Sequence, residues 1–313
     1  MRPALLLLLV LSACKAAPTE GLPDLLPDHP EAGASRAFWD AWGDGNAELS
    51  SYRATTGRYG ALRPAELVLI YVTEPHDRRT WIKDDDVQGD ARVPVLKLNQ
   101  SLKFQTGIYP YSVMTSVFAP ADQWGGERFS PARITLSAQE WCGHVFHAVM
   151  PGRSSFRSTL LSYFAGEGEA TRTVEAPAGT LYEDALLIQL RELDGPFNGG
   201  RSWQGSLVPS LWSRRTAHTD LVTVPATLTR ADTVRADSAG APQPVTRFRL
   251  AYTSFTRTFD VEKAAPRRIL GWTTSTGETA ALSGTARLPY WKLHDPGDES
   301  SRARFGLTTP LVP

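Results

Sequence analysis

The stretch Leu67-Val68-Leu69-Ile70-Tyr71-Val72-Thr73 decides the fold of this chain. Its β-branched and aromatic residues favour a strand. The apolar residues follow one another without alternating with polar ones, which is typical of a strand covered on both faces. Glu74-Pro75 comes next, and we expect the strand to end there because proline has no N–H to donate to a sheet ladder. The sequence therefore predicts a central strand at residues 67–73.

Further runs of strand-forming residues continue along most of the chain and are divided by Gly, Pro, Asn and Asp. They occupy residues 93–98, 109–118, 134–149, 247–255, 257–261, 269–274 and 279–293. Repeated short runs with turn residues between them predict a large antiparallel sheet. The stretch 231–244 carries small residues, Asp and two prolines, so we expect a long exposed loop there.

One segment breaks the strand pattern. Thr180-Leu181-Tyr182-Glu183 has the spacing of a capping box, in which a Thr hydroxyl and a Glu carboxylate each satisfy a free N–H at a helix start. Apolar residues follow at mostly helical spacing, and Gly195-Pro196 supplies the stop. These apolar residues cover more than one face of the helix. We therefore expect a largely buried helix with the sheet curling around it.

A shorter helix is expected near the start of the globular body. Ser35 is a suitable cap, and Phe38, Trp39 and Trp42 would share one side before the chain reaches Gly43. Three aromatic residues on two turns imply burial against the body. The predicted fold is thus mainly β: a large curved antiparallel sheet or half-barrel that wraps one buried helix, with a short N-terminal helix.

The composition is that of an ordinary globular protein. The chain has 313 residues, of which 42% are hydrophobic, and 33 Lys and Arg residues balance 33 Asp and Glu residues. The hydrophobic content excludes disorder along the whole length. The formal charge of zero gives no broad positive field, which binding to nucleic acid or to an anionic membrane requires. We therefore expect no nucleic-acid partner.

The N-terminus has the order of a secretory signal peptide. Arg2 precedes an apolar run at residues 4–10, which is too short to span a bilayer. Leu11-Ser12-Ala13-Cys14 follows and resembles the lipobox of bacterial lipoproteins, which implies lipidation of Cys14. The alternative is an ordinary cleaved signal with an incidental cysteine. Lys15 stands where an Asp would imply retention in the inner membrane, so we expect an outer-membrane lipoprotein, facing the periplasm rather than the cell surface.

These patterns divide the chain into four parts. They are a signal peptide at 1–13, the lipidated Cys14 with a Pro-rich tether at 14–34, a single β-rich globular domain at 35–295, and a C-terminal tail at 296–313. A split of the domain near residue 200 is the alternative. The chain has two cysteines, Cys14 and Cys142. Once Cys14 carries lipid, Cys142 is the only free thiol, so no intrachain disulfide is expected.

The densest group of polar residues is Glu140-Trp141-Cys142-Gly143-His144. Residues two apart on one strand share a face, so Glu140, Cys142 and His144 would point together. Thiolate, imidazole and carboxylate are zinc ligands, and an imidazole beside a thiol can also activate it as a nucleophile. The opposing interpretation is that Cys142 is a small buried apolar residue and His144 a hydrogen-bonded structural histidine. His29, His76, His218 and His294 lack metal-ligand spacing, and no cofactor is expected. His144 and His147 could instead face together on a helix, but their β-branched and aromatic neighbours favour a strand.

Other polar groups in the sequence are interpreted as solvent-exposed. Asp84-Asp85-Asp86 lacks the alternation of a calcium loop and is expected in a hairpin loop. Glu167 and Glu169 are expected to be exposed loop carboxylates rather than a glycosidase pair.

Phosphate-loop, nucleophile-elbow and HExxH motifs are absent from the sequence. Aromatic residues of the second half either fill the core or line a cavity for an apolar ligand; the candidates are Trp203, Trp212, Trp272, Tyr290 and Trp291.

Four segments carry a resemblance to a known family. They lie at residues 38–45, 106–114, 139–144 and 181–186, and they resemble a family of bacterial lipoproteins often labelled "septum formation inhibitor Maf", over about residues 38 to 293. The resemblance implies no established activity. True Maf proteins are nucleotide pyrophosphatases with a Ser/Arg-rich phosphate-binding segment, which this chain does not have, so no Maf catalytic residue is carried over. The order of elements is also similar to exported lipoprotein carriers, in which a curved sheet wraps a helix.

The leading functional prediction is a non-enzymatic, lipid-anchored envelope protein that binds an apolar ligand or an envelope partner. An enzyme is the first alternative: a thiol- or metal-dependent envelope hydrolase or transferase centred on Cys142 and His144, with Glu140 orienting the imidazole or completing a metal site. A purely structural assembly lipoprotein is the second.

Overall fold

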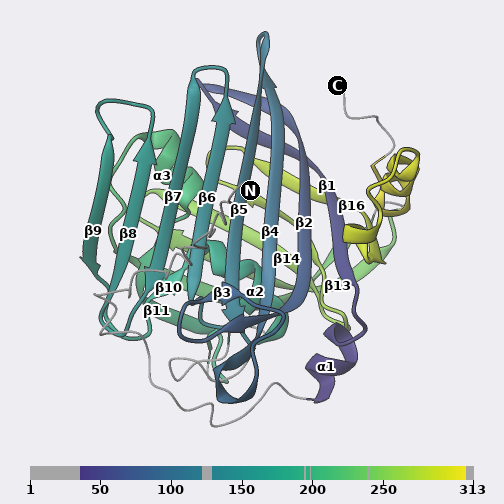
Figure 1. Ribbon diagram of the computed structural model, residues 1–313. Coiled ribbons are helices and arrows are strands. Elements are labelled where there is room, and N and C mark those ends of the chain that lie inside the picture. The colour runs from purple at the N-terminus through teal and green to yellow at the C-terminus, as the bar shows by residue number, and fades with distance from the viewer. Residues whose placement is uncertain (1–35, 122–128, 194, 198, 238–239, 308–313) are drawn as a thin grey trace, which may run out of the picture.

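The strands of this protein belong to one sheet. In the computed structural model, which describes residues 36–121, 129–193, 195–197, 199–237 and 240–307, this sheet has sixteen strands (Figure 1). They are β1 (Ala47–Arg58), β2 (Ala61–Asp77), β3 (Ile82–Lys83), β4 (Arg92–Thr106), β5 (Tyr109–Pro120), β6 (Arg133–Glu140), β7 (Gly143–Pro151), β8 (Ser155–Ser162), β9 (Glu169–Glu175), β10 (Leu181–Tyr182), β11 (Ser202–Val208), β12 (Val224–Ala236), β13 (Pro242–Tyr252), β14 (Phe255–Glu262), β15 (Ile269–Thr274) and β16 (Thr279–Leu288).

Short helices accompany the sheet. The α-helices are α1 (Arg36–Trp42), α2 (Leu186–Glu192) and α3 (Leu211–Ala217), and the 3-10 helices include η1 (Gly89–Ala91), η3 (Glu183–Ala185), η4 (Tyr290–Lys292) and η5 (Asp298–Phe305). The strand order is β10-β11-β12-β13-β14-β15-β16-β1-β2-β4-β5-β6-β7-β8-β9, and β3 pairs with β2. Neighbours along this path run antiparallel, apart from β10 and β11, which run parallel. The strands before and after residue 200 therefore belong to the same sheet.

The sheet curls back on itself and forms two facing layers (Figure 1). Strands β1 to β9 make one layer and strands β10 to β16 make the other. Helices α2 and α3 lie between the two layers. The outermost strands are β9 and the two-residue β10. This arrangement confirms the predicted mainly-β half-barrel around a buried helix.

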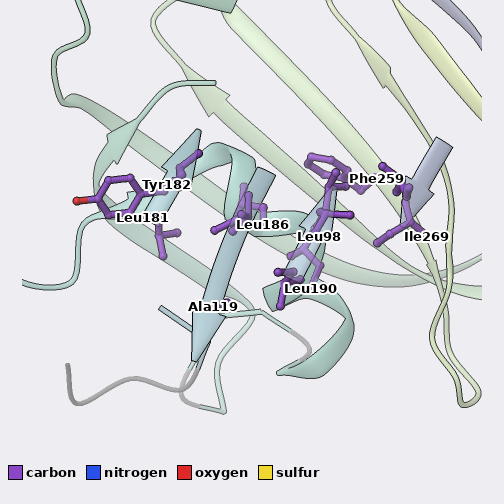
Figure 2. Packing of buried hydrophobic residues seen from close by; sticks show 14 of the residues in the cluster. Leu98, Ala119, Leu181, Tyr182, Leu186, Leu190, Phe259 and Ile269 are labelled. Atoms are coloured by element: carbon purple, nitrogen blue, oxygen red, sulfur yellow. The ribbon is translucent and has the colours of Figure 1, made fainter. Parts of the chain in front are cut away.

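The main core lies between the two layers and is organised around α2. Leu186 and Leu190 have no exposed surface, and Leu187 and Ile188 are also buried. A helix with apolar residues on more than one face needs cover from more than one side, and the two sheet layers supply that cover. Figure 2 shows the helix residues between side chains of both layers, among them Leu98, Ala119, Phe259 and Ile269.

Strand β2 is buried on both faces, as predicted. Leu67, Leu69 and Tyr71 belong to the core between the layers, while Val68 and Val72 pack in a second cluster outside it. The expected end at Glu74-Pro75 is wrong, because the strand continues to Asp77. Pro75 lies directly opposite Pro94 on β4. Directly opposed residues of an antiparallel pair exchange two hydrogen bonds or none, so two opposed prolines remove no ladder bond.

The predicted capping box is also wrong. The hydroxyl of Thr180 donates to the carbonyl of Pro177 instead of capping the helix. The carboxylates of Glu183 and Asp184 accept the backbone N–H groups of Ser210 and Leu211, each at 3.0 Å. The two acidic residues therefore cap the start of α3, a helix distant in sequence, and α2 begins through the 3-10 turn η3.

Other expected loops and runs differ from the structure. The expected loop at 231–244 is mostly a β-hairpin, since β12 extends to Ala236 and β13 begins at Pro242. The run 134–149 is two strands, β6 and β7, joined by a tight turn. Part of the expected C-terminal tail forms η5, which buries Phe305 against the second cluster.

Helix α1 is short and ends as predicted at Gly43, whose N–H donates to the carbonyl of Trp39. Phe38 and Trp42 are buried, but Trp39 is 41% exposed, so the expectation that all three aromatic rings share a buried side is wrong. The proposed cap, Ser35, lies outside the described residues, as do Cys14 and the tether.

Candidate functional site

The structure separates the three residues of the predicted polar site. Glu140 ends β6, Cys142 lies in the turn, and His144 lies on β7. The Glu140 carboxylate is buried and accepts the N–H of Cys142 at 2.7 Å, while the Cys142 and His144 side chains are exposed. The premise that all three share one strand is therefore wrong, because the hairpin turn falls between them. The alternative that Cys142 is buried is wrong as well.

The thiol of Cys142 lacks the surroundings of an activated nucleophile. The Glu140 carboxylate beside it raises the pKa of the Cys142 thiol above its ordinary value. Reactive cysteines require the opposite shift, which a neighbouring cation provides. Among the residues described by the structure, no group of three or more His, Cys, Asp or Glu side chains is arranged to hold a metal ion. This turn therefore carries an exposed thiol that is not activated.

A cavity of about 350 Å³ opens between the two layers and α3. Its apolar walls include Leu67 of β2, Trp212 of α3, Phe255 of β14 and Trp272 of β15. We call this space the aromatic cavity. Of the five candidate aromatics, Trp212 and Trp272 line this cavity and also contact the core. Trp203 packs against the core without lining the cavity, Tyr290 packs against the second cluster, and Trp291 is exposed. The space is aromatic on one side and open enough to receive a small ligand.

Polar groups also line the aromatic cavity. The Glu183 carboxylate accepts hydrogen bonds from Tyr252 Oη at 2.8 Å and from Arg257 Nη1 at 2.9 Å. The Glu278 carboxylate accepts the hydroxyl of Thr56 at 3.0 Å and the N–H of Gly57 at 2.8 Å. These groups are already oriented by protein partners, so they hold a fixed set of charges and dipoles next to the aromatic walls.

A second, smaller cavity of about 110 Å³ lies between α3 and strands β6 to β9. His147 and Ser158 line it, with His147 Nε2 at 2.7 Å from Ser158 Oγ. Glu167 lines it too and contacts His218 Nδ1 at 2.5 Å and Arg215 Nη1 at 3.2 Å. The expectation that Glu167 is exposed is wrong, since its side chain is only 15% exposed, whereas Glu169 is exposed. We call this space the polar cavity.

His147 was considered only as a helical partner of His144 and was not proposed as a site residue, although the strand pattern of the sequence contained a signal for it. On a strand it shares a face with Val145 and Val149, both buried. Burial lowers the pKa of His147 to about 4, so the imidazole is neutral at neutral pH. Together with the Ser158 hydroxyl it presents a neutral donor and acceptor to the polar cavity.

Replacing His147 with glutamine should reduce the acid sensitivity of the fold. Because the pKa of His147 is lowered in the folded state, the unfolded chain takes up the proton first, and stability falls as the pH drops from about 6.5 towards 4. Between about pH 7.5 and 4.5 the wild type should lose about 2–3 kcal/mol more unfolding free energy than His147→Gln. Urea unfolding at both pH values measures this difference. The exposed His144→Gln on the same strand is the control, and equal losses in wild type and His147→Gln would refute the assignment.

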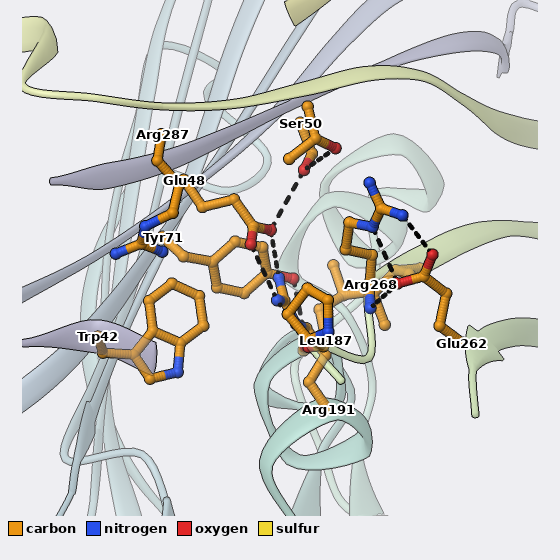
Figure 3. A network of polar contacts seen from close by, with 12 residues as sticks. Trp42, Glu48, Ser50, Tyr71, Leu187, Arg191, Glu262, Arg268 and Arg287 are labelled. Carbon is orange, nitrogen blue, oxygen red and sulfur yellow. Dashed lines mark hydrogen bonds and ion pairs between the residues drawn. The ribbon is translucent and has the colours of Figure 1, made fainter. Parts of the chain in front are cut away.

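The opposite end of the half-barrel holds a buried ion pair beside a cavity of about 310 Å³. Arg191 of α2 donates to the Glu48 carboxylate of β1 at 2.6 and 3.1 Å, and the two side chains are 1% and 3% exposed. Figure 3 shows this pair beside Trp42 and Tyr71, with the guanidinium 5.1 and 4.5 Å from the two ring centroids. Burial alone would raise the pKa of Glu48, but the charge of Arg191 and the hydrogen bonds from Arg191 and Ser50 together outweigh burial and lower the pKa. The pair ties α2 to the sheet.

Comparisons with protein-family models, curated proteins and solved structures gave no match. Of the helices in the described part of the chain, none has the length and apolar character needed to cross a bilayer. The function has to be argued from the geometry of the cavities alone.

Proposed function

We propose that this chain is a lipid-anchored protein of the bacterial envelope that binds a small amphipathic ligand in the aromatic cavity and does not transform it chemically. The anchor is the predicted lipid on Cys14, and the expected location is the periplasmic face of the outer membrane. The observation that carries the proposal is the aromatic cavity itself, with a volume of about 350 Å³ between the layers.

The lining favours a ligand with an apolar body and polar groups. Trp212, Trp272 and Phe255 offer flat apolar surfaces, against which an alkyl chain or ring gains free energy by leaving water. Arg257 and Glu183, which also line the cavity, provide charged hydrogen-bonding groups for the polar end of the ligand. A purely aliphatic ligand would leave these groups without a polar contact from the ligand, which is unfavourable.

The enzymatic alternative gains no support from the site that it names. The raised pKa of the Cys142 thiol disfavours the thiolate form, and the His144 side chain is exposed on a strand beyond the turn. A binding function needs neither group.

Filling the aromatic cavity should weaken ligand binding. Ala54 of β1 lines the cavity, and an Ala54→Trp side chain would occupy the space of the ligand. The probe is dansylaminoundecanoic acid, a fluorescent fatty acid with an apolar chain and a carboxylate, which should receive energy transfer from Trp212 and Trp272. We expect an at least tenfold weaker affinity in Ala54→Trp, or about 1.4 kcal/mol.

The matched control is Ala231→Trp, which adds the same side chain at an exposed position of β12 outside the cavity. It should bind the probe like the wild type. Trp212→Ala tests the same wall by removal and should lower both the affinity and the energy transfer. Unchanged affinity in both Ala54→Trp and Trp212→Ala would exclude the aromatic cavity as the binding site.

A further inference from the structure

Exposed apolar side chains gather at one end of the half-barrel. The antiparallel order places the turns after β1, β4, β6 and β8 at the same end, opposite to α1 (Figure 1). These turns and their flanks carry five exposed residues, which we call the rim: Tyr59, Leu62, Ile108, Trp141 and Tyr163. Ile108, Trp141 and Tyr163 are 78%, 68% and 66% exposed, the highest values for large hydrophobic side chains in the described part of the chain.

Contacts between neighbouring hairpins hold the rim together. The hydroxyl groups of Tyr59 and Tyr111 are 2.8 Å apart, and Tyr109 Oη donates to Tyr59 Oη at 3.3 Å. The Tyr109 and Trp141 rings lie with centroids 6.1 Å apart. The next hairpin follows directly, because the Tyr163 N–H donates to the carbonyl of His144. The rim is therefore one connected surface rather than four independent loops.

Acidic groups near the rim are mostly turned away from solvent. The Glu140 carboxylate is engaged by the Cys142 N–H, and Glu167 is held by Ser162 and His218. Glu169 is the exposed exception. The turn at residues 104–109 contains no charged residue. The five rim residues themselves carry no charge, and the acidic groups close to them are mostly engaged by protein partners.

We propose that the rim docks on the surface of an electrically neutral lipid bilayer. Trp and Tyr rings are the side chains that settle at the headgroup level of membranes, where one part of the ring is apolar and the other contacts water. Because neighbouring hairpins are joined at the rim, its exposed rings can enter the headgroup layer as one surface. Phe146 of β7 and Leu161 of β8 are paired in register below the rim and extend the apolar surface.

The position of the rim agrees with an anchor on Cys14. A fully extended chain from residue 14 to residue 36 spans at most roughly 70–80 Å. Strand β2, with 17 residues, is about 58 Å long. The anchor therefore permits the rim to reach the same bilayer that holds the lipid, even though α1 lies at the other end.

Docking would also bring the aromatic cavity to the membrane. Residues 55–57 at the end of β1 and Thr276 and Glu278 in the turn before β16 border this cavity, and both segments lie at the rim end. The docking proposal nevertheless stands apart from ligand binding, because attachment to vesicles is measured without a ligand.

The exposed thiol of Cys142 makes the test specific to the rim. In the full chain carrying Cys14→Ser, Cys142 is the single thiol and takes an environment-sensitive fluorophore. On addition of phosphatidylcholine vesicles, its emission should shift to the blue, and vesicles with brominated acyl chains should quench it. The matched control carries the label at Ile82→Cys in the Cys14→Ser/Cys142→Ser background. Ile82 is 56% exposed on β3 at the opposite end, and this label should show neither effect.

Removal of rim side chains completes the test. Ile108→Ser/Tyr163→Ser, in the labelled Cys14→Ser chain, should lower the vesicle partition coefficient at least about tenfold. Val234→Ser removes an equally apolar side chain, 58% exposed at the other end, and should leave the coefficient unchanged. No blue shift at Cys142, or equal shifts at both label positions, would overturn the proposal and leave a protein surface as the partner of the rim.

Discussion

Arg191→Met is expected to destabilise the protein by about 3–5 kcal/mol. The substitution keeps an apolar side chain of similar length in α2 but leaves the Glu48 carboxylate, 3% exposed, without its cation. A buried charge without a partner is far more costly than a buried neutral group. The cation–π contacts of Arg191 with Trp42 and Tyr71 are lost as well. Urea unfolding near neutral pH, followed by tryptophan fluorescence, measures the loss.

Two further variants separate the buried charge from simple loss of a contact. Glu48→Gln/Arg191→Met removes both charges and should recover most of the lost stability, since a buried ion pair replaced as a unit costs little. Arg172→Met breaks an exposed pair, with side chains 58% and 73% exposed, and should cost no more than about 1 kcal/mol. If Arg191→Met and Arg172→Met cost the same, the buried ion pair does not hold α2 in place.

Cys14→Ser is expected to abolish incorporation of a fatty acid into the protein and to move it from the membrane to the soluble fraction. Thioether formation needs the sulfur nucleophile, which a hydroxyl does not replace. Each buried CH₂ of the acyl chains contributes about 0.8 kcal/mol, so several chains hold a protein at the membrane almost permanently. Metabolic labelling with an alkyne-bearing palmitate, followed by membrane fractionation, measures both effects.

The other cysteine supplies the control for this experiment. Cys142→Ser removes the other of the two cysteines of the chain and should retain full labelling. Persistent labelling of Cys14→Ser would contradict the lipid anchor and, with it, the proposed location. It would leave the aromatic cavity and its ligand untouched, because Ala54→Trp tests that part separately.

The elements that could be predicted from sequence are those specified by local pattern. The apolar run at residues 67–72 of β2 and the apolar residues Leu186, Leu187, Ile188 and Leu190 of α2 each indicate cover on more than one side, because apolar side chains there point to more than one face. The prediction of a mainly-β half-barrel combined these two elements with the repeated strand-forming runs along the rest of the chain. The strand ends were predicted less accurately than the strands themselves. Strand β2 continues past Pro75 because this proline lies opposite Pro94 on β4, so its effect depends on the residue across the ladder.

The cavities could not be predicted because their groups meet only through tertiary contacts. Glu183 was interpreted as a cap for its own helix, whereas it binds Ser210, Tyr252 and Arg257. Nothing in the local sequence of 180–183 indicates these partners. Trp212 and Trp272 were predicted as cavity candidates by residue type alone. The helix that carries Trp212 was missed, because its two adjacent arginines, Arg214 and Arg215, obscure the apolar pattern.

The border of the open sheet has a consequence for crowded conditions. Strand β9 ends the sheet with Glu169, Arg172 and Glu175, all exposed. Unsatisfied backbone groups at a sheet border invite pairing with another copy, and charged side chains there oppose it by keeping their water. On the proposed lipid anchor, molecules held in one membrane plane would collide often, and we expect this charged border to oppose their pairing edge to edge.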